Sequence, residues 1–185
     1  MKVCIYGAGA IGGWIGVRVA QAGCDVSVVA RGDTLKAIQA DGLRLESSGA
    51  TSAVPVRASA NPADLGVQDL VVVAVKAPAM AGVAQAIAPL IGPDTLVLTA
   101  MNGVPWWFFE GFGGPLAGTR LKAVDPDGAI AAAIPGRHII GCVVHASCSL
   151  NGPGHVKQHF GNKLIVGEPS GEKTARVQQL TALLG

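Results

Sequence analysis

The chain has 185 residues, of which 50% are hydrophobic and 14% charged, and its formal net charge is +2. That length suffices for one domain with a sizeable core, and the composition excludes an intrinsically disordered chain. A net charge this small gives no reason to expect nucleic acid or a membrane surface as a partner. The four cysteines form no C-x-x-C pair, so we interpret them as reduced side chains of a cytoplasmic protein.

The first 31 residues predict a strand, a glycine-rich turn, a helix and a second strand. Residues 2–6 (KVCIY) form the first strand, GAGAIG follows, an apolar helical run extends to about residue 23, and residues 25–30 (DVSVVA) form the second strand. In such a unit Gly7 permits the tight turn, Gly9 lets the backbone approach a pyrophosphate, and Gly12 lets the helix pack closely on the sheet. The alternative is a glycine-rich turn that binds nothing.

The end of the second strand indicates which dinucleotide would bind. NAD sites usually place Asp or Glu about 20 residues after the glycines, to accept a hydrogen bond from the ribose 2′-hydroxyl. This chain has Ala30-Arg31-Gly32 there, with no carboxylate before Asp33. A guanidinium matches a phosphate in charge and geometry, so Arg31 favours NADP through the 2′-phosphate. The alternative is a solvated Arg at the end of a strand.

Strands and helices continue to alternate along the chain. We expect a helix at 34–40 capped by Asp33, a hairpin of strands 42–46 and 53–57, a buried strand at 69–75, a helix at 77–91 and a buried strand at 95–99. Lys76 and Asn102 follow two of the buried strands, as the glycines and Arg31 follow the first two. Ligands of open α/β sheets bind beyond the carboxyl ends of the strands, so these residues should converge. A surface Lys and a plain Asn-Gly turn are the alternatives.

Four aromatic residues stand together at Trp106–Phe109, in the unusual stretch 104–118. They could wall a substrate site or contact a partner domain. We favour a short capping helix that buries their rings in the core.

The pattern changes to strands from residue 139 onwards. We predict an antiparallel meander from the three segments IIGCVVHAS, GHVKQHF and KLIVGEP, with hairpin turns at Asn151-Gly152 and Gly161-Asn162. His155 and His159 would share one face of a strand, but no nearby Cys, Asp or Glu completes a metal site, so we expect no bound metal. Residues 171–184 predict an amphipathic helix. The expected fold is a Rossmann-type, doubly wound α/β sheet whose parallel N-terminal part is extended by antiparallel strands.

Five stretches of the chain carry a resemblance to a known family: KVCIYGAGAIGG, the strand end at Arg31, VVAVKA around Lys76, MNGVPWW around Asn102 and the later HAS…GPGHVKQHFGNKLIVGEP hairpins. Together they resemble the ketopantoate reductase (2-dehydropantoate 2-reductase) family. The resemblance covers the whole chain. It implies NADPH-dependent reduction of ketopantoate to pantoate, on the way to pantothenate and coenzyme A. It also implies a cofactor-binding domain at 1–170, with 171–185 as the start of the helix that links it to a helical domain missing here.

The resemblance assigns roles to individual residues. Lys76 and Asn102 would lie by the nicotinamide ribose and the substrate, Arg31 would bind the 2′-phosphate, and Ser147 would contact the cofactor through its backbone. The pyrophosphate would be held by Gly7, Ala8, Gly9, Ala10, Ile11 and Gly12. The Lys that protonates the new alkoxide would fall beyond Gly185, so we expect the chain to be inactive alone. A homodimer would form, if at all, through the missing domain.

Two other functions stay open from the sequence. A stand-alone NADP(H)-binding sensor module could act through a partner at the Trp106–Phe109 cluster. A reductase of another 2-oxo acid would share the cofactor residues, because the missing domain contributes most of the substrate choice.

Overall fold

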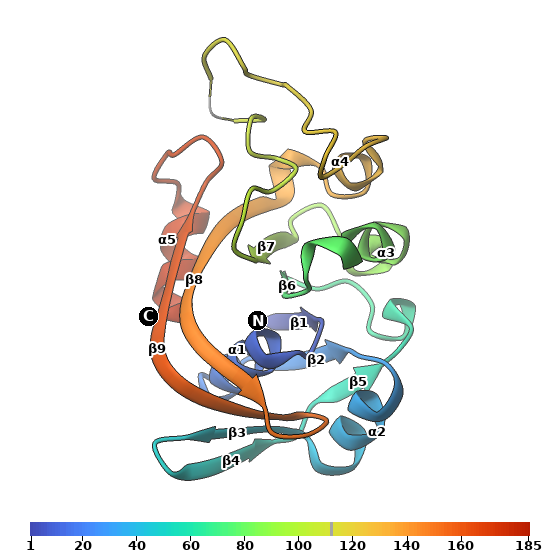
Figure 1. Ribbon diagram of the computed structural model, residues 1–185, viewed down its shortest axis with the longest axis vertical. Helices are drawn as coiled ribbons and strands as arrows, with labels where there is room; N and C mark the ends of the chain where they lie inside the picture. The colour runs from blue at the N-terminus through green and yellow to red at the C-terminus, as the bar shows by residue number, and fades with distance from the viewer. Residues whose placement is uncertain (112) are drawn as a thin grey trace.

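In the computed structural model, which describes residues 1–111 and 113–185, nine strands form one curled sheet in the order β4-β3-β9-β8-β7-β6-β1-β2-β5 (Figure 1). Five α-helices accompany it in the same described part of the chain. The expected class, a Rossmann-type α/β sheet with an antiparallel extension, is confirmed. Phe112, which belongs to the stretch 104–118, lies outside the described residues.

The N-terminal βαβ unit is as predicted. Its elements are β1 (Lys2–Tyr6), α1 (Ala10–Gln21) and β2 (Asp25–Val29). β1 lies between β2 and β6 and is parallel to both. The apolar side chains of this central strand are buried, because helices cover both faces of the sheet.

The next segment differs from prediction in two places. It comprises α2 (Gly32–Asp41), β3 (Leu43–Ser47), β4 (Ala50–Val54), β5 (Arg57–Ser59) and η1 (Pro62–Asp64). Arg31 is the N-cap of α2, so the assignment of Asp33 as the cap was wrong, and Asp33 lies in the first turn. The hairpin exists but is tighter than expected, since Ser48 and Gly49 turn it with φ of 52° and 79°. Arg57 belongs to β5, which pairs in parallel with β2.

The predicted helix at 77–91 is interrupted. The structure has β6 (Leu70–Val73), η2 (Ala77–Ala79), α3 (Met80–Ala86), η3 (Ala88–Leu90) and β7 (Leu96–Ala100). Pro78 and Pro89 lie in the two short 3-10 helices that flank α3. A proline inside a helix removes a hydrogen bond and clashes with the preceding turn, which explains why α3 is short.

The last part of the sheet is a single long hairpin. β8 (Ile139–Leu150) and β9 (His155–Gly167) are antiparallel, and β9 also pairs in parallel with β3. The turn near Asn151 is as predicted, but the hairpin turn expected at Gly161-Asn162 was wrong. Gly161 has φ of 74° beside a register shift, and a Cβ on it would lie 2.4 Å from the His145 carbonyl oxygen. The glycine therefore makes a bulge in a continuous strand.

Two hydrophobic cores lie on opposite faces of the sheet. One contains the buried face of α1 and Leu180 of α5 (Ala175–Leu184), and the other contains α3 and Ile130 of α4 (Ala129–Ala133). Figure 1 shows the long β8–β9 hairpin curving past α1, with α5 behind the hairpin in this view and α3 and α4 on the other side of the sheet. The last helix begins at Ala175, later than predicted, because Thr174 caps it by accepting from the Val177 N–H.

The aromatic cluster does not form the capping helix that we favoured, since Trp106–Phe109 lies in irregular turns. Trp106 is buried in the second core, whereas Phe108 is 38% exposed. The remaining short 3-10 helix is η4 (Gly136–His138). Within the part of the chain that the structure describes, no helix is long and apolar enough to cross a bilayer.

Candidate functional site

The carboxyl ends of four parallel strands meet at one edge of the sheet. Tyr6 of β1 is in register with Val29 of β2 and with Val73 of β6, and Val73 is in register with Thr99 of β7. The segments that follow these strands therefore leave the sheet side by side. The predicted site segments Gly7–Gly12, Arg31, Lys76 and Asn102 are brought to this edge.

The glycine loop combines a packed base with an open rim. Gly7 has φ of 99°, and a Cβ on it would lie 2.6 Å from Val75 Cγ1. A Cβ on Gly12 would lie 2.0 Å from the Gly7 carbonyl oxygen, so the turn and the helix touch there. Gly9 is different, because a Cβ on it would meet nothing within 4 Å. The loop is held together at Gly7 and Gly12 and is open at Gly9.

The start of α1 offers donors to this open side. Gly9 is the N-cap and has no side chain to bond to the first N–H groups, which lack acceptors within a helix. No acidic residue lies in the first turn of α1. A helix N-terminus of this kind attracts anions through its free N–H groups and its dipole.

A cleft of about 620 Å³ lies between the loop and the ends of β6 and β7. Lys76 and Asn102 line it opposite Gly9. Its other lining residues are Gly7, Ala10, Ile11, Ala74, Val75, Ala77, Ala100 and Met101. Lys76 is exposed and is the N-cap residue of η2, where its side chain makes no capping hydrogen bond.

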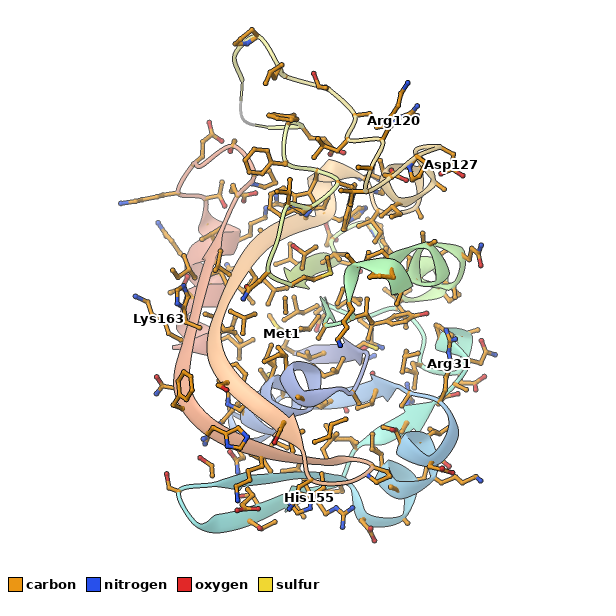
Figure 2. All side chains as sticks on the ribbon, viewed as in Figure 1. Met1, Arg31, Arg120, Asp127, His155 and Lys163 are labelled. Atoms are coloured by element: carbon orange, nitrogen blue, oxygen red, sulfur yellow. The ribbon has the colours of Figure 1, made fainter. Side chains whose placement is uncertain are left out.

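Arg31 lines a second cleft, of about 470 Å³, which shares Gly7, Gly9 and Val75 with the first. Figure 2 shows Arg31 near the carboxyl end of β2, on the side of the molecule opposite Lys163. The buried Tyr6 lines the same cleft. Burial raises the pKa of the Tyr6 hydroxyl, and the neighbouring Arg31 guanidinium partly offsets that rise by charge and by hydrogen bonding.

Asn102 uses both ends of its amide on the neighbouring strand. Its Nδ2 donates to the Val144 carbonyl oxygen at 3.1 Å, and the Val144 N–H donates to its Oδ1 at 2.9 Å. The last regular pair between the two strands is Ala100 with Cys142. The side chain thus continues the pairing after β7 has ended, while one amide N–H and one oxygen lone pair remain for another partner.

Ser147 lines neither of these two clefts. It lines a third depression, of about 590 Å³, together with Ile11, Val144 and Phe160. Ile11 also lines the central cleft, so the two cavities adjoin. The bulge in the β8–β9 pairing falls at Ser147, where a change of register frees backbone groups from the ladder.

Sequence reasoning missed two parts of this edge. Tyr6 reads as one more apolar residue of a strand, although its position directly before Gly7 would have indicated that its hydroxyl lies near the site. The contact of Asn102 with the Val144 backbone could not be predicted, because it depends on the register between β7 and β8. No group of three His, Cys, Asp or Glu suited to a metal ion occurs within residues 1–111 and 113–185.

Comparison with known proteins agrees with this architecture. The family model described as ketopantoate reductase PanE/ApbA matches residues 3–106. A 2-dehydropantoate 2-reductase of Mesorhizobium japonicum is 51% identical over 181 residues, which are 97% of this chain and 56% of that protein. The chain thus spans about half the length of the curated relatives it matches.

Solved structures of ketopantoate reductases also resemble this chain. A protein of Ralstonia solanacearum described as a ketopantoate reductase superposes with a TM-score of 0.95 at 56% identity, over 98% of this chain and 56% of its own. The 2-dehydropantoate 2-reductase of Geobacter metallireducens superposes with a TM-score of 0.81 at 28% identity, over 100% of this chain and 55% of its own. With a family model covering more than half of its residues, the chain belongs to the ketopantoate reductase PanE/ApbA family.

Proposed function

We propose that this chain is the NADP-binding part of an oxidoreductase that reduces ketopantoate to pantoate with NADPH, a step of pantothenate and coenzyme A biosynthesis. The observation that supports the proposal most is the continuity of the two clefts from Arg31 past Gly9 to Lys76 and Asn102. NADPH has a 2′-phosphorylated ribose at its adenosine end and a nicotinamide at the other, which matches a groove with a guanidinium at one end and polar side chains at the other.

The residues of the groove fit such a cofactor. A Cβ at Gly9 would project into open space, so this rim is shaped for a group that approaches the backbone closely. The α1 N-terminus and the flanking loop Gly7–Gly12, including Ala8, Ala10 and Ile11, would hold the pyrophosphate. Arg31 would bind the 2′-phosphate, and one charge-assisted contact of this kind is worth about 1.5–3 kcal/mol.

The other end of the groove would hold the reacting groups. A bound nicotinamide would supply the hydride for the ketone carbon. Lys76 and Asn102 would orient the ribose and the oxo acid, and the Ser147 backbone would contact the cofactor from the neighbouring depression. The carbonyl oxygen then needs a proton, and we propose that this proton comes from a Lys outside the 185 residues, so that the chain alone does not turn over.

The proposal extends to the organisation of the protein. Residues 1–170 would form the cofactor-binding domain, and 171–185 would begin the connection to a further, helical part through which a homodimer could form. A cytoplasmic location is supported by the cysteines, since Cys4, Cys24, Cys142 and Cys148 are all free thiols. Burial raises the pKa of Cys4 and of Cys142 to about 12, so neither is poised for disulfide exchange.

A titration of the chain with NADPH and with NADH, monitored by cofactor fluorescence, tests the proposal. Binding of NADPH at least tenfold tighter than NADH, with the preference lost in Arg31→Ala, is the expected result. Equal binding would remove Arg31 from its role and leave a reductase of another 2-oxo acid with either cofactor. Binding of neither would contradict the assignment of the groove.

A further inference from the structure

A separate pocket lies between α1, β9 and α5, beside the core that contains the buried face of α1 and Leu180. Its volume is about 350 Å³, within the range of about 300–1,000 Å³ that small-molecule sites occupy. This α1–α5 pocket shares no lining residue with the two clefts of the groove or with the depression at Ser147. A molecule bound in it would therefore leave the proposed cofactor site free.

Aliphatic side chains from all three elements line the α1–α5 pocket. α1 contributes Ile15 and Val19, which are buried in the core. β9 contributes Leu164, and α5 contributes Leu183 and Leu184. These three leucines pack against the core but are only partly buried, so the hydrophobic effect would favour an alkyl chain that covered them.

Arg18 of α1 brings a positive charge to the same pocket. Its Nη2 donates to Ser47 Oγ at 3.3 Å and to Gln158 Oε1 at 3.1 Å, and both acceptors are neutral. Across residues 1–111 and 113–185, Nε and Nη1 of Arg18 donate to no protein acceptor, and the guanidinium forms no ion pair. A guanidinium binds carboxylates through two adjacent N–H groups, so Arg18 has donors left for an anionic ligand.

Trp14 adds a second unused donor to the wall. Its side chain is 3% exposed, and its indole N–H is buried without a hydrogen-bond partner in the part of the chain that the structure describes. A buried donor without an acceptor is destabilising, so a ligand that supplied an acceptor would be favoured. The unused donors of Trp14 and Arg18 therefore both suit a ligand that carries an acceptor group.

We infer that the α1–α5 pocket binds a small amphipathic carboxylate, which has a linear alkyl chain of medium length and one terminal carboxylate. Arg18 pairs with the carboxylate, and the three leucines cover the chain. A neutral hydrocarbon would leave the charge of Arg18 unused, and a small anion would leave the leucines exposed. The inference is independent of the proposed function, because the pocket and the groove have no residue in common.

Calorimetry on the chain with decanoate and with decylamine tests the inference. The two probes have the same ten-carbon chain and opposite charges at neutral pH. We expect decanoate to bind about tenfold tighter or more, because only its head group can pair with a guanidinium. In the series hexanoate, octanoate and decanoate, the affinity should rise about two- to fourfold for each added methylene group.

A charge variant tests the role of Arg18. Arg18→Gln should weaken decanoate about tenfold or more and should not weaken decylamine. Arg120→Gln is the matched control, because it removes the same charge from an exposed residue at the far end of the molecule from α1 (Figure 2). The affinity for NADPH should be unchanged in both variants, which shows that the fold is intact.

A filling variant tests whether the chain occupies this pocket. Ala22 is exposed at the end of α1 and lines the pocket, so Ala22→Phe should weaken decanoate about tenfold while NADPH binds as before. Ala40→Phe makes the same change at an exposed position of α2 that does not line the pocket, and decanoate binding should be unchanged.

The indole N–H signals in nuclear magnetic resonance spectra report where the acid binds. The chain has three tryptophans, and the signal of Trp14 is the one that disappears in Trp14→Phe. Decanoate should shift that signal more than the signals of Trp106 and Trp107, which do not line the α1–α5 pocket.

Several results would overturn the inference. They are equal affinities for decanoate and decylamine, undiminished decanoate binding in Arg18→Gln or in Ala22→Phe, and a shift of the Trp107 signal in place of the Trp14 signal. If another segment of a longer protein occupies the pocket, the full-length protein will not bind decanoate, which overturns the inference as well.

Discussion

The Asn102 side chain forms a two-way hydrogen bond with the backbone of Val144, at 3.1 Å from Nδ2 to the carbonyl oxygen and 2.9 Å from the N–H to Oδ1. This pair joins the end of β7 to β8 at the edge where the central cleft opens. The same side chain faces the groove, so it connects the stability of the sheet edge to the proposed binding of cofactor and substrate.

Replacing Asn102 should therefore affect both properties. Asn102→Ala leaves the Val144 N–H and carbonyl without their partner, and we expect a loss of about 1–3 kcal/mol in the free energy of unfolding. Asn102→Asp keeps the acceptor for the Val144 N–H but sets a carboxylate oxygen against the Val144 carbonyl oxygen, so we expect it to be destabilised as well. Chemical denaturation of the three proteins measures this. Equal stability of all three would show that the pair contributes nothing.

Tyr6 should position Arg31 for the 2′-phosphate. Tyr6→Phe removes the hydroxyl that interacts with the guanidinium, at a cost of about 0.5–1.5 kcal/mol in NADPH binding, and should leave NADH binding unchanged. Because Tyr6 is the only tyrosine, its pKa can be followed by ultraviolet absorbance. Arg31→Ala should raise that pKa further, since the offsetting positive charge is gone. A lower pKa in Arg31→Ala would contradict the contact.

Two alanine substitutions in the glycine loop should behave in opposite ways. Gly9→Ala meets no atom within 4 Å and has an ordinary φ of −75°, so the fold should change in stability by less than about 1 kcal/mol, yet the new methyl group should obstruct the pyrophosphate. Gly12→Ala would place its Cβ 2.0 Å from the Gly7 carbonyl oxygen and should destabilise the fold by about 1–3 kcal/mol. Thermal unfolding and NADPH titration, run on both variants, distinguish these effects. Unimpaired NADPH binding in Gly9→Ala would count against the loop as the pyrophosphate site.

The Glu168 carboxylate, 5% exposed, accepts hydrogen bonds from Arg176 Nε at 2.6 Å and from Arg176 Nη2 at 2.5 Å, and this ion pair should make stability depend on pH. Hydrogen bonding to Arg176 lowers the pKa of Glu168, so its contribution is present above the ordinary Glu pKa of about 4.3 and is lost as pH falls through the lower value in the folded protein. Glu168→Gln should reduce the loss of stability between about pH 5 and pH 3. Denaturation midpoints across this interval provide the measurement. An identical pH profile for the variant would exclude a contribution from the pair.

Much of the fold could be predicted because local pattern determined it. The β1–α1–β2 unit and the buried strands β6 and β7 have strong periodicity and clear turn residues, and their carboxyl ends placed Arg31, Lys76 and Asn102 on one edge. The long β9 could not be predicted, since Gly161 suits a hairpin turn as well as a bulge and the pairing with β8 decides between them. The aromatic segment was likewise ambiguous, because burial of Trp106 and exposure of Phe108 depend on contacts distant in sequence.

The candidate site, like the fold, could be predicted from the sequence only in part. Residue types at strand ends predicted a groove for an anionic ligand, and the structure brings Gly9, Lys76 and Asn102 to one cleft. The partner of Asn102 and the contact between Tyr6 and Arg31 depend on how separate strands and loops meet. No local pattern encodes these contacts.

If Arg31 and Lys76 lie at opposite ends of one dinucleotide groove, a ligand that carries only one end of the dinucleotide will distinguish their roles. The measurement is the dissociation constant of 2′,5′-ADP, which carries only the phosphorylated adenosine end, and of NADPH, for the unaltered chain, Arg31→Ala and Lys76→Ala. Arg31→Ala should weaken both ligands by about ten- to a hundredfold, whereas Lys76→Ala should weaken NADPH alone. Unchanged binding of both ligands in Arg31→Ala, or weaker 2′,5′-ADP binding in Lys76→Ala, would contradict the assignment.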